Sequence, residues 1–254
     1  MNGLEQLTGE NLWLAVPAIL AAGLVHGTFG IGFPLVATPL LALFTDVRTA
    51  VLITLLPTMA VNITVLSTSG NLRAGLGRHW RVIPFVLVGA IVGTFLLTVL
   101  DPRPFLLLLA GAILLYLNQH RIAGLKMSWV RRRTDLAYAL FGLTAGLMAG
   151  TVNVMVPVMI ILAMELGMPT LAMVQLFNLN FLSAKLTQSV VFLHGGQLTL
   201  DGLANTLLLI PVALAALFVG MWLRRRISEE RYRSVLRGVL WVMAAVLVVR
   251  FCVT

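Results

Sequence analysis

The sequence predicts an all-α protein that crosses a membrane several times. Of its 254 residues, 59% are hydrophobic and only 11% are charged, and the mean hydropathy is +0.99. Soluble domains carry about a quarter charged residues, so this chain is far too apolar for a soluble fold. Apolar segments recur along the chain at close to the roughly 20 residues that cross a bilayer, and glycines interrupt two of them. We therefore expect two repeats, each a glycine-broken helical hairpin followed by transmembrane helices, with about eight to ten membrane helices in total.

The apolar runs and their breaks define five segments in each half. In the first half they are hairpin arms at 12–29 and 33–44 and spans at 49–67, 82–100 and 104–119. In the second half they are arms at 136–149 and 154–166 and spans at 170–193, 203–223 and 234–253. We therefore divide one integral membrane domain into a first repeat at 1–119, a basic cytoplasmic linker at 120–135 and a second repeat at 136–254.

Each hairpin is predicted from a break inside an apolar run. The stretch HGTFGIGFPLVATP at 26–39 places three glycines and two prolines there. Within a helix these residues cost about 1 and 3 kcal/mol relative to alanine, so the helix must be interrupted. The freed backbone groups survive at membrane depth only where protein or a water-filled cavity covers them. The second break lies near Gly150, Thr151 and Asn153.

Residue identities support a repeat of the two halves. AGLVHGTFG at 22–30 matches TAGLMAG at 144–150 when Gly27 is aligned with Gly146. Separately, Pro84, nine residues before Gly93, matches Pro211, nine residues before Gly220. Interrupted helices in inverted repeats are typical of secondary transporters, which hold the substrate at the broken ends. The pattern predicts a binding site at the hairpin tips near mid-membrane.

Positive charge predicts the orientation. Arginine and lysine concentrate at 73–81, 121–133 and 224–233, and such loops favour the cytoplasmic side. All three basic loops lie on the cytoplasmic side only if each broken apolar run enters and leaves the membrane by the same face. The two halves of the chain are then inverted relative to one another. We therefore expect a multi-pass protein of the plasma (inner) membrane with both termini outside. The net charge of +9 is thus read as a topology signal, not as a nucleic-acid surface.

The chain resembles the TauE/SafE family, a group of sulfite exporters and organosulfonate permeases. The resemblance rests on the first hairpin GTFGIGFPLVATPLLAL, on RHWR at 78–81 before a span with Pro84, Gly89 and Gly93, and on the second copy beginning GLTAGLMAG. It implies a carrier of sulfur-containing or organic anions that is driven by a proton gradient. The chain departs from the family's denser glycine run at Thr28 and Phe29 and at TVNVMVP, 151–157.

Lys185 is the most informative candidate for binding the substrate. It falls near the middle of the span 170–193, where a lysine costs at least about 2.5–3.5 kcal/mol. It is expected to face the interior as a counter-charge for an anion; the alternatives are a structural ion pair or snorkelling to an interface. The other candidates are polar or glycine residues expected near it or at the tips: Asn62, Asn178, Ser183, Gln188, Gly27, Thr28, Gly30, Gly32, Gly150, Thr151 and Asn153. For most of these the alternative is helix packing.

His26 lies beside the first tip and is the candidate for coupling protons to transport, since histidine titrates near neutral pH. The alternative is a neutral histidine that is hydrogen-bonded to backbone. No metal or cofactor is expected: the methionines between 148 and 173 have no histidine or cysteine beside them, and Cys252 is the one cysteine.

The sequence therefore favours a secondary permease for a small sulfur-containing or organic anion, with export coupled to the proton gradient. Its expected partners are that anion and the lipid bilayer, with no nucleic acid, and a homodimer is left open. The alternatives are an accessory subunit of a larger membrane complex and an intramembrane enzyme. The enzyme is disfavoured because neither HExxH nor GxSxG occurs and Ser183 is too close along the helix to face Lys185.

Overall fold

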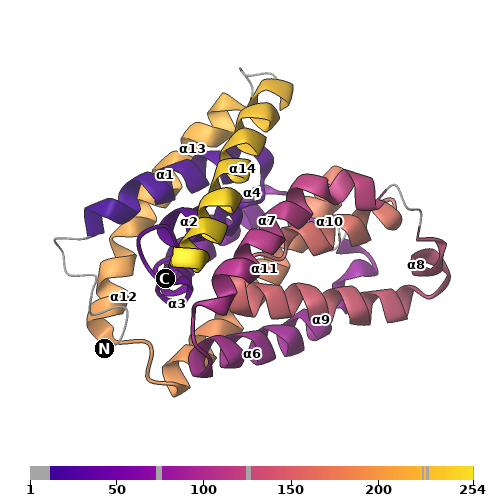
Figure 1. Cartoon of the computed structure of the whole chain (residues 1–254). Helices are drawn as coiled ribbons and strands as arrows, with labels where there is room; N and C mark the ends of the chain where they lie inside the picture. Colours follow the sequence, from indigo (N-terminus) through magenta and orange to yellow (C-terminus); the bar gives the residue numbers. More distant parts are fainter. Residues whose placement is uncertain (1–11, 73–75, 124–126, 225, 227–228, 254) are drawn as a thin grey trace.

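A computed structural model describes residues 12–72, 76–123, 127–224, 226 and 229–253 (Figure 1). All regular elements in these residues are helices, as predicted. In the first half they are α1 (Leu12–Phe29), α2 (Phe33–Leu41), α3 (Val47–Ile53), α4 (Leu55–Thr68), the 3-10 helix η1 (His79–Val82), α6 (Ile83–Val99) and α7 (Pro104–Ala123). In the second half they are α8 (Ser128–Arg132), α9 (Thr134–Val152), α10 (Val156–Glu165), α11 (Thr170–His194), α12 (Leu200–Leu207), α13 (Leu209–Leu223) and α14 (Glu229–Val253).

Two segments predicted as single helices are broken. The segment 49–67 is interrupted at Thr54, between α3 and α4, which are bent by 46°. The segment 203–223 begins earlier, at Leu200, and is interrupted at Leu208. A proline removes a hydrogen bond to the carbonyl four residues before it and its ring clashes with that carbonyl. Pro57 and Pro211 lie at that distance from Ile53 and Leu207, so each proline ends the preceding helix.

Four helical segments in the described residues are long and apolar enough to cross a membrane: His79–Val99, Thr134–Val152, Gly202–Leu223 and Leu236–Val253. The bent pair α3 and α4 raises the number to five. This is fewer than the eight to ten membrane helices expected. α11 is long enough but does not qualify, because buried polar residues such as Gln175, Asn178 and Lys185 lower its hydropathy.

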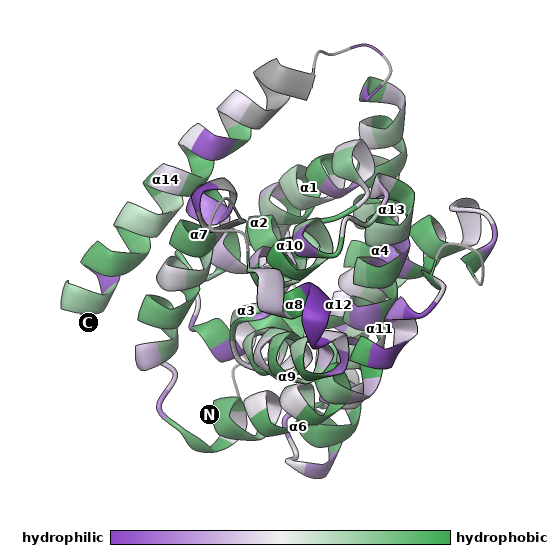
Figure 2. Cartoon of the chain, turned by 90° about the vertical axis from the view of Figure 1, so that its right-hand side faces the viewer, coloured by the Kyte–Doolittle hydropathy of each residue, from purple (hydrophilic) through white to green (hydrophobic). Residues whose placement is uncertain are grey.

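The outer faces of the long helices are apolar, as a lipid environment requires. Phe95 on α6 and Trp241 on α14 are more than half exposed, as is Val249. Figure 2 shows hydrophobic residues along much of α14 and α6. Exposed apolar surface of this extent is unfavourable in water, so these helices fit a membrane.

The first arm of each hairpin packs against a helix from the other half of the chain. α1 lies along α13, and α9 lies along α6 (Figure 1). Glycines allow both approaches: a methyl group at Gly27 would overlap the Leu217 carbonyl, and one at Gly146 would overlap the Val86 carbonyl. Gly27 therefore lies in close contact with the backbone of α13.

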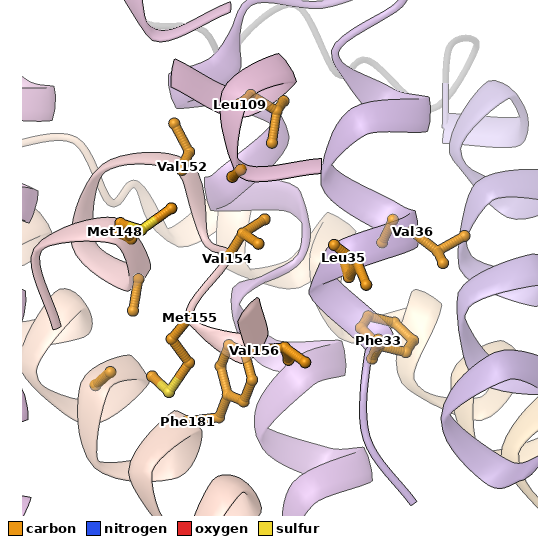
Figure 3. Packing of buried hydrophobic residues seen from close by; sticks show 14 of the residues in the cluster. Phe33, Leu35, Val36, Leu109, Met148, Val152, Val154, Met155, Val156 and Phe181 are labelled. Carbon is orange, nitrogen blue, oxygen red and sulfur yellow. The ribbon is translucent and has the colours of Figure 1, made fainter. Parts of the chain in front are cut away.

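The hairpins meet in a common core. Within each half the two arms contact each other, α1 with α2 and α9 with α10. The core includes Leu35 and Val36 of α2, Val154 and Met155 between α9 and α10, and Phe181 of α11, all buried (Figure 3). α11, which belongs to the second half, also packs against α4 and α6 of the first half.

Candidate functional site

The first hairpin tip is a short non-helical link between α1 and α2. Gly30 and Gly32 have φ angles of 75° and 102°, in the left-handed region that favours glycine. Gly32 is the N-cap of α2, and Pro34 stands in the first turn of α2, where its missing N–H costs no hydrogen bond. Glycine is therefore required at this tip for its backbone conformation.

Asn178 on α11 holds the first tip closed. Its Nδ2 donates to the carbonyls of Gly30 and Val174, each at 2.7 Å. Its Oδ1 lies 3.1 Å from Nε2 of His26. One buried amide thus connects α11 to the end of α1 and to the tip that follows.

The hydrogen bonds of His26 define its tautomer. Nδ1 accepts from the backbone N–H of Phe33 at 3.2 Å, so the proton is on Nε2, which donates to Asn178. The ring is 1% exposed. In this structure the ring of His26 is therefore neutral and accepts a hydrogen bond from the backbone.

The second hairpin tip is held by Asn153. This residue ends α9 in the left-handed conformation, with φ 61°, which asparagine tolerates better than most residues. Its Nδ2 donates to Oγ1 of Thr38 on α2 and to Oγ1 of Thr54, each at 2.9 Å. The second tip is thus fixed to the first hairpin and to the break between α3 and α4.

Lys185 is buried beside the second hairpin. Its side chain is 1% exposed, and Nζ donates to Oε1 of Gln188 at 2.6 Å. Gln188 in turn donates from Nε2 to the carbonyls of Ala149 and Gly150, at 3.2 and 3.0 Å. In the described part of the chain no carboxylate pairs with Lys185, since the ion pair found there is Arg81 with Asp135.

One face of α11 therefore contacts both tips. Asn178, Lys185 and Gln188 follow one another at about two turns and then about one turn, so they share a face. Asn178 contacts the first tip, and Gln188 contacts the last turn of α9. Lys185 lies between these two residues along α11.

Several buried polar atoms near these helices have no protein partner among the described residues. Asn62 leaves both amide atoms unpaired, Thr58 and Thr94 leave their hydroxyls unpaired, and Asn153 and Asn180 leave their Oδ1 atoms unpaired. A buried polar group without any partner costs about 1–3 kcal/mol, so these atoms are the places near the tips where water or a ligand could bind. Thr54, the N-cap of α4, and Thr58 and Asn62 within α4 succeed one another by about one turn and form a polar stripe.

The remaining predicted residues have local roles. Thr28 donates from Oγ1 to the carbonyls of Leu24 and Gly220, and Thr151 donates to the carbonyl of Leu147. Gly150 lies against the Ala90 carbonyl of α6 in a close helix contact. Ser183 is half-buried on α11, and its carbonyl accepts from Thr187.

A cavity of about 420 Å³ opens beside the first tip. Of the predicted site residues, Thr28 and Gly32 line it, whereas Lys185, Asn62, Asn153 and Gln188 do not. The predicted site residues therefore lie in two separate regions. One is the cavity at the first tip, and the other is a buried polar cluster near the second tip. The sequence analysis missed both arginines of the cavity wall, because it treated Arg224 only as a topology signal and did not single out Arg237.

A helical membrane fold in which interrupted helices meet a cavity and buried polar groups is typical of membrane transport proteins. Residues 15–247 match the family described as sulfite exporter TauE/SafE. The chain therefore belongs to the TauE/SafE family, whose members are membrane transporters and not enzymes. No curated protein and no solved structure matches the chain significantly.

Proposed function

We propose that this protein is a secondary permease that exports a small sulfur-containing or organic anion across the plasma membrane, coupled to the proton gradient. The observation that carries the anion assignment is Lys185, a buried lysine whose Nζ has one hydrogen-bond partner in the described structure, the neutral Gln188. An ionisable side chain buried at membrane depth is by default a candidate for function, and the ligand that would complement a lysine is an anion.

The packing of the halves supports an inverted-repeat transporter. α1, the first arm of the first hairpin, lies against α13 of the second half. α9, the first arm of the second hairpin, lies against α6 of the first half. Gly27 and Gly146, which the repeat aligns, make equivalent contacts in the two helix pairs, and Gly93 and Gly220 complete them. In this arrangement the two tips and the polar face of α11 form the substrate path.

The proposed orientation places both termini outside and the three basic loops inside. Contacts between helix ends are consistent with it, because they join ends assigned to the same face. Arg48 donates to the carbonyls of Leu97 and Leu100 on the proposed outer side. Arg131 donates to the Glu165 carbonyl on the proposed inner side. The cavity wall includes Arg224 and Arg237, so the cavity would open to the cytoplasm.

His26 is the proposed site of proton coupling. A second proton on the ring would sit on Nδ1 and would turn it from an acceptor into a donor. The hydrogen bond from the Phe33 N–H at the start of α2 would then be lost. Protonation would thus loosen the first tip, next to the cavity.

The test is flux of labelled sulfite, thiosulfate and a small organosulfonate in proteoliposomes, with and without a pH gradient. We expect gradient-dependent flux of at least one anion, and its loss in Lys185→Ala. Arg132→Gln, which removes an exposed positive charge, is the control that should transport normally. Flux by the purified protein alone also excludes a purely accessory role, and unchanged flux in folded Lys185→Ala contradicts the role of Lys185.

A further inference from the structure

An apolar groove lies between α7 and α14, which pack along each other (Figure 1). Leu114 of α7 lines it together with Trp241, Ala244, Ala245 and Val248 of α14, and its volume is about 320 Å³. The two alanines have small side chains, so they leave a depression beside the indole of Trp241, which is 53% exposed. The groove is separate from the cavity at the first tip, because no residue lines both.

The groove requires an apolar occupant. No charged, hydroxyl or amide side chain is among the described residues that line it. Water does not fill an apolar hollow of this kind, and an empty hollow deprives the atoms of its wall of dispersion contacts. In a membrane an acyl chain restores those contacts, so the groove is shaped for part of a lipid.

Two arginines lie at one end of the groove. Arg237 precedes Trp241 by four residues and Arg121 follows Leu114 by seven, and these spacings place each arginine on the groove face of its helix. Gln119 and Arg237 line the same cavity, so the end of α7 lies level with this part of α14. The two arginines therefore belong to the same end of the groove, beyond Trp241.

This end of the groove favours a negative head group. Arg121 and Arg237 are both exposed, and the ion pair found among the described residues, between Arg81 and Asp135, involves neither of them. Arginine binds phosphate through charge-assisted hydrogen bonds. Basic pockets between transmembrane helices on the cytoplasmic side bind anionic head groups, and both arginines lie at helix ends assigned to that side.

We propose that an anionic phospholipid binds between α7 and α14, with an acyl chain in the groove and its phosphate at Arg121 and Arg237. The apolar groove accounts for the chain, and the two cations account for the preference over a zwitterionic lipid. This inference goes beyond the proposed function, since the lipid is a bound component of the protein and not the transported anion.

The experiment uses tryptophan fluorescence of the purified protein in phosphatidylcholine nanodiscs. A small, fixed fraction of the lipid is replaced by phosphatidylglycerol or phosphatidylcholine with brominated chains, which quench a tryptophan on contact. The difference in emission between the wild type and Trp241→Phe isolates Trp241. We expect brominated phosphatidylglycerol to quench Trp241 at a fraction about five- to twentyfold lower than brominated phosphatidylcholine does, because two cations attract its head group.

Trp13 provides the reference within the same protein. It is 66% exposed on α1, and no lysine or arginine precedes Arg48 in the chain. Its contribution, isolated with Trp13→Phe, should be quenched equally by the two brominated lipids. This comparison removes any general enrichment of phosphatidylglycerol around the protein.

The head-group contacts are tested by removing one charge at a time. Arg237→Gln and Arg121→Gln should each lower the preference for phosphatidylglycerol at Trp241 by about fivefold. Arg103→Gln is the matched control, because it removes the same charge from an exposed position at the opposite end of α7 and should leave the preference unchanged.

The chain contact is tested by filling the groove. Ala245→Phe, at an exposed position, should remove the preference at Trp241 while both arginines remain. Val246→Phe is its control, since Val246 is 42% exposed on α14 but does not line the groove. If Ala245→Phe does not fold, Ala245→Leu replaces it.

Three results would overturn the inference. One is equal quenching of Trp241 by the two lipids, and another is a preference that survives the arginine substitutions or the filled groove. The third is no quenching of Trp241 by either lipid, which would show that protein, such as a second copy of this chain, covers the groove. All three concern a site outside the proposed substrate path, so anion flux is a separate measurement.

Discussion

At the scale of single residues, Asn178 connects α11 to the first tip and to His26. Its amide pairs with the backbone of the first tip and with the ring of His26, all within a buried region. Neutral amides in membrane proteins commonly join helices, and Asn178 in addition accepts a hydrogen bond from the ring of His26.

We expect Asn178→Ala to lower the free energy of unfolding by about 1–3 kcal/mol, because it leaves the Gly30 carbonyl and the His26 Nε2–H buried without their partner. Denaturation of the purified protein measures this. Asn118→Ala is the control: Asn118 donates only to the Leu114 carbonyl of its own helix at an exposed position. Equal effects of the two substitutions would show that the first tip does not depend on Asn178.

A second residue-scale prediction concerns His26. Gln offers an amide that can bond to Asn178 or Phe33 but cannot take up a proton at physiological pH. We expect His26→Gln to retain substrate binding and to transport at a rate that no longer depends on the imposed pH gradient. Proteoliposome flux at two gradients measures this, and full gradient dependence in the variant would assign proton coupling to another group.

At the scale of elements, the two long helix pairs depend on glycine. In α9 the glycines at 146 and 150 face the backbone of α6, and in α1 Gly23 and Gly27 face that of α13. Small residues bring helix backbones close enough for extensive van der Waals contact, which is a main source of helix association in membranes.

We therefore expect Gly146→Ala to lower the free energy of unfolding by about 1–3 kcal/mol, since the added methyl group meets backbone atoms of Val86 and Ala90 that cannot move away cheaply. Gly111→Ala in α7 is the matched control. No atom lies within 4 Å of a methyl group at Gly111, so alanine there should stabilise the helix by about 0.5–1 kcal/mol. A neutral Gly146→Ala would contradict the close packing of α6 on α9.

At the scale of the whole molecule, the proposed topology makes opposite faces of the membrane chemically distinguishable. Asp101 and Arg132 are both exposed and lie at ends assigned to the outer and inner sides. In a Cys252→Ala background, we expect Asp101→Cys to react with a membrane-impermeant maleimide in intact cells and Arg132→Cys to react only after permeabilisation. Labelling of both from the same side would contradict a single crossing by α7, and the reverse labelling pattern would contradict the proposed orientation.

The sequence by itself determined the membrane class, the helical fold and most helix boundaries. Hydropathy and the positions of glycine and proline act locally, and they suffice for this. The arm 12–29 coincides with α1, and the span 170–193 coincides with α11 to within one residue. Even the breaks at Thr54 and Leu208 have a local cause in Pro57 and Pro211, although the analysis of apolar runs overlooked it.

Only the tertiary structure decided which polar residues lie together. Nothing local to Asn153 indicates Thr38 or Thr54 as partners, and nothing near Asn178 indicates Gly30. These contacts join residues far apart in the chain, and they depend on how the hairpins cross α11. The same packing separates Lys185 from the cavity and brings Arg224 and Arg237 to the cavity wall, because helix packing, and not sequence spacing, determines which faces meet.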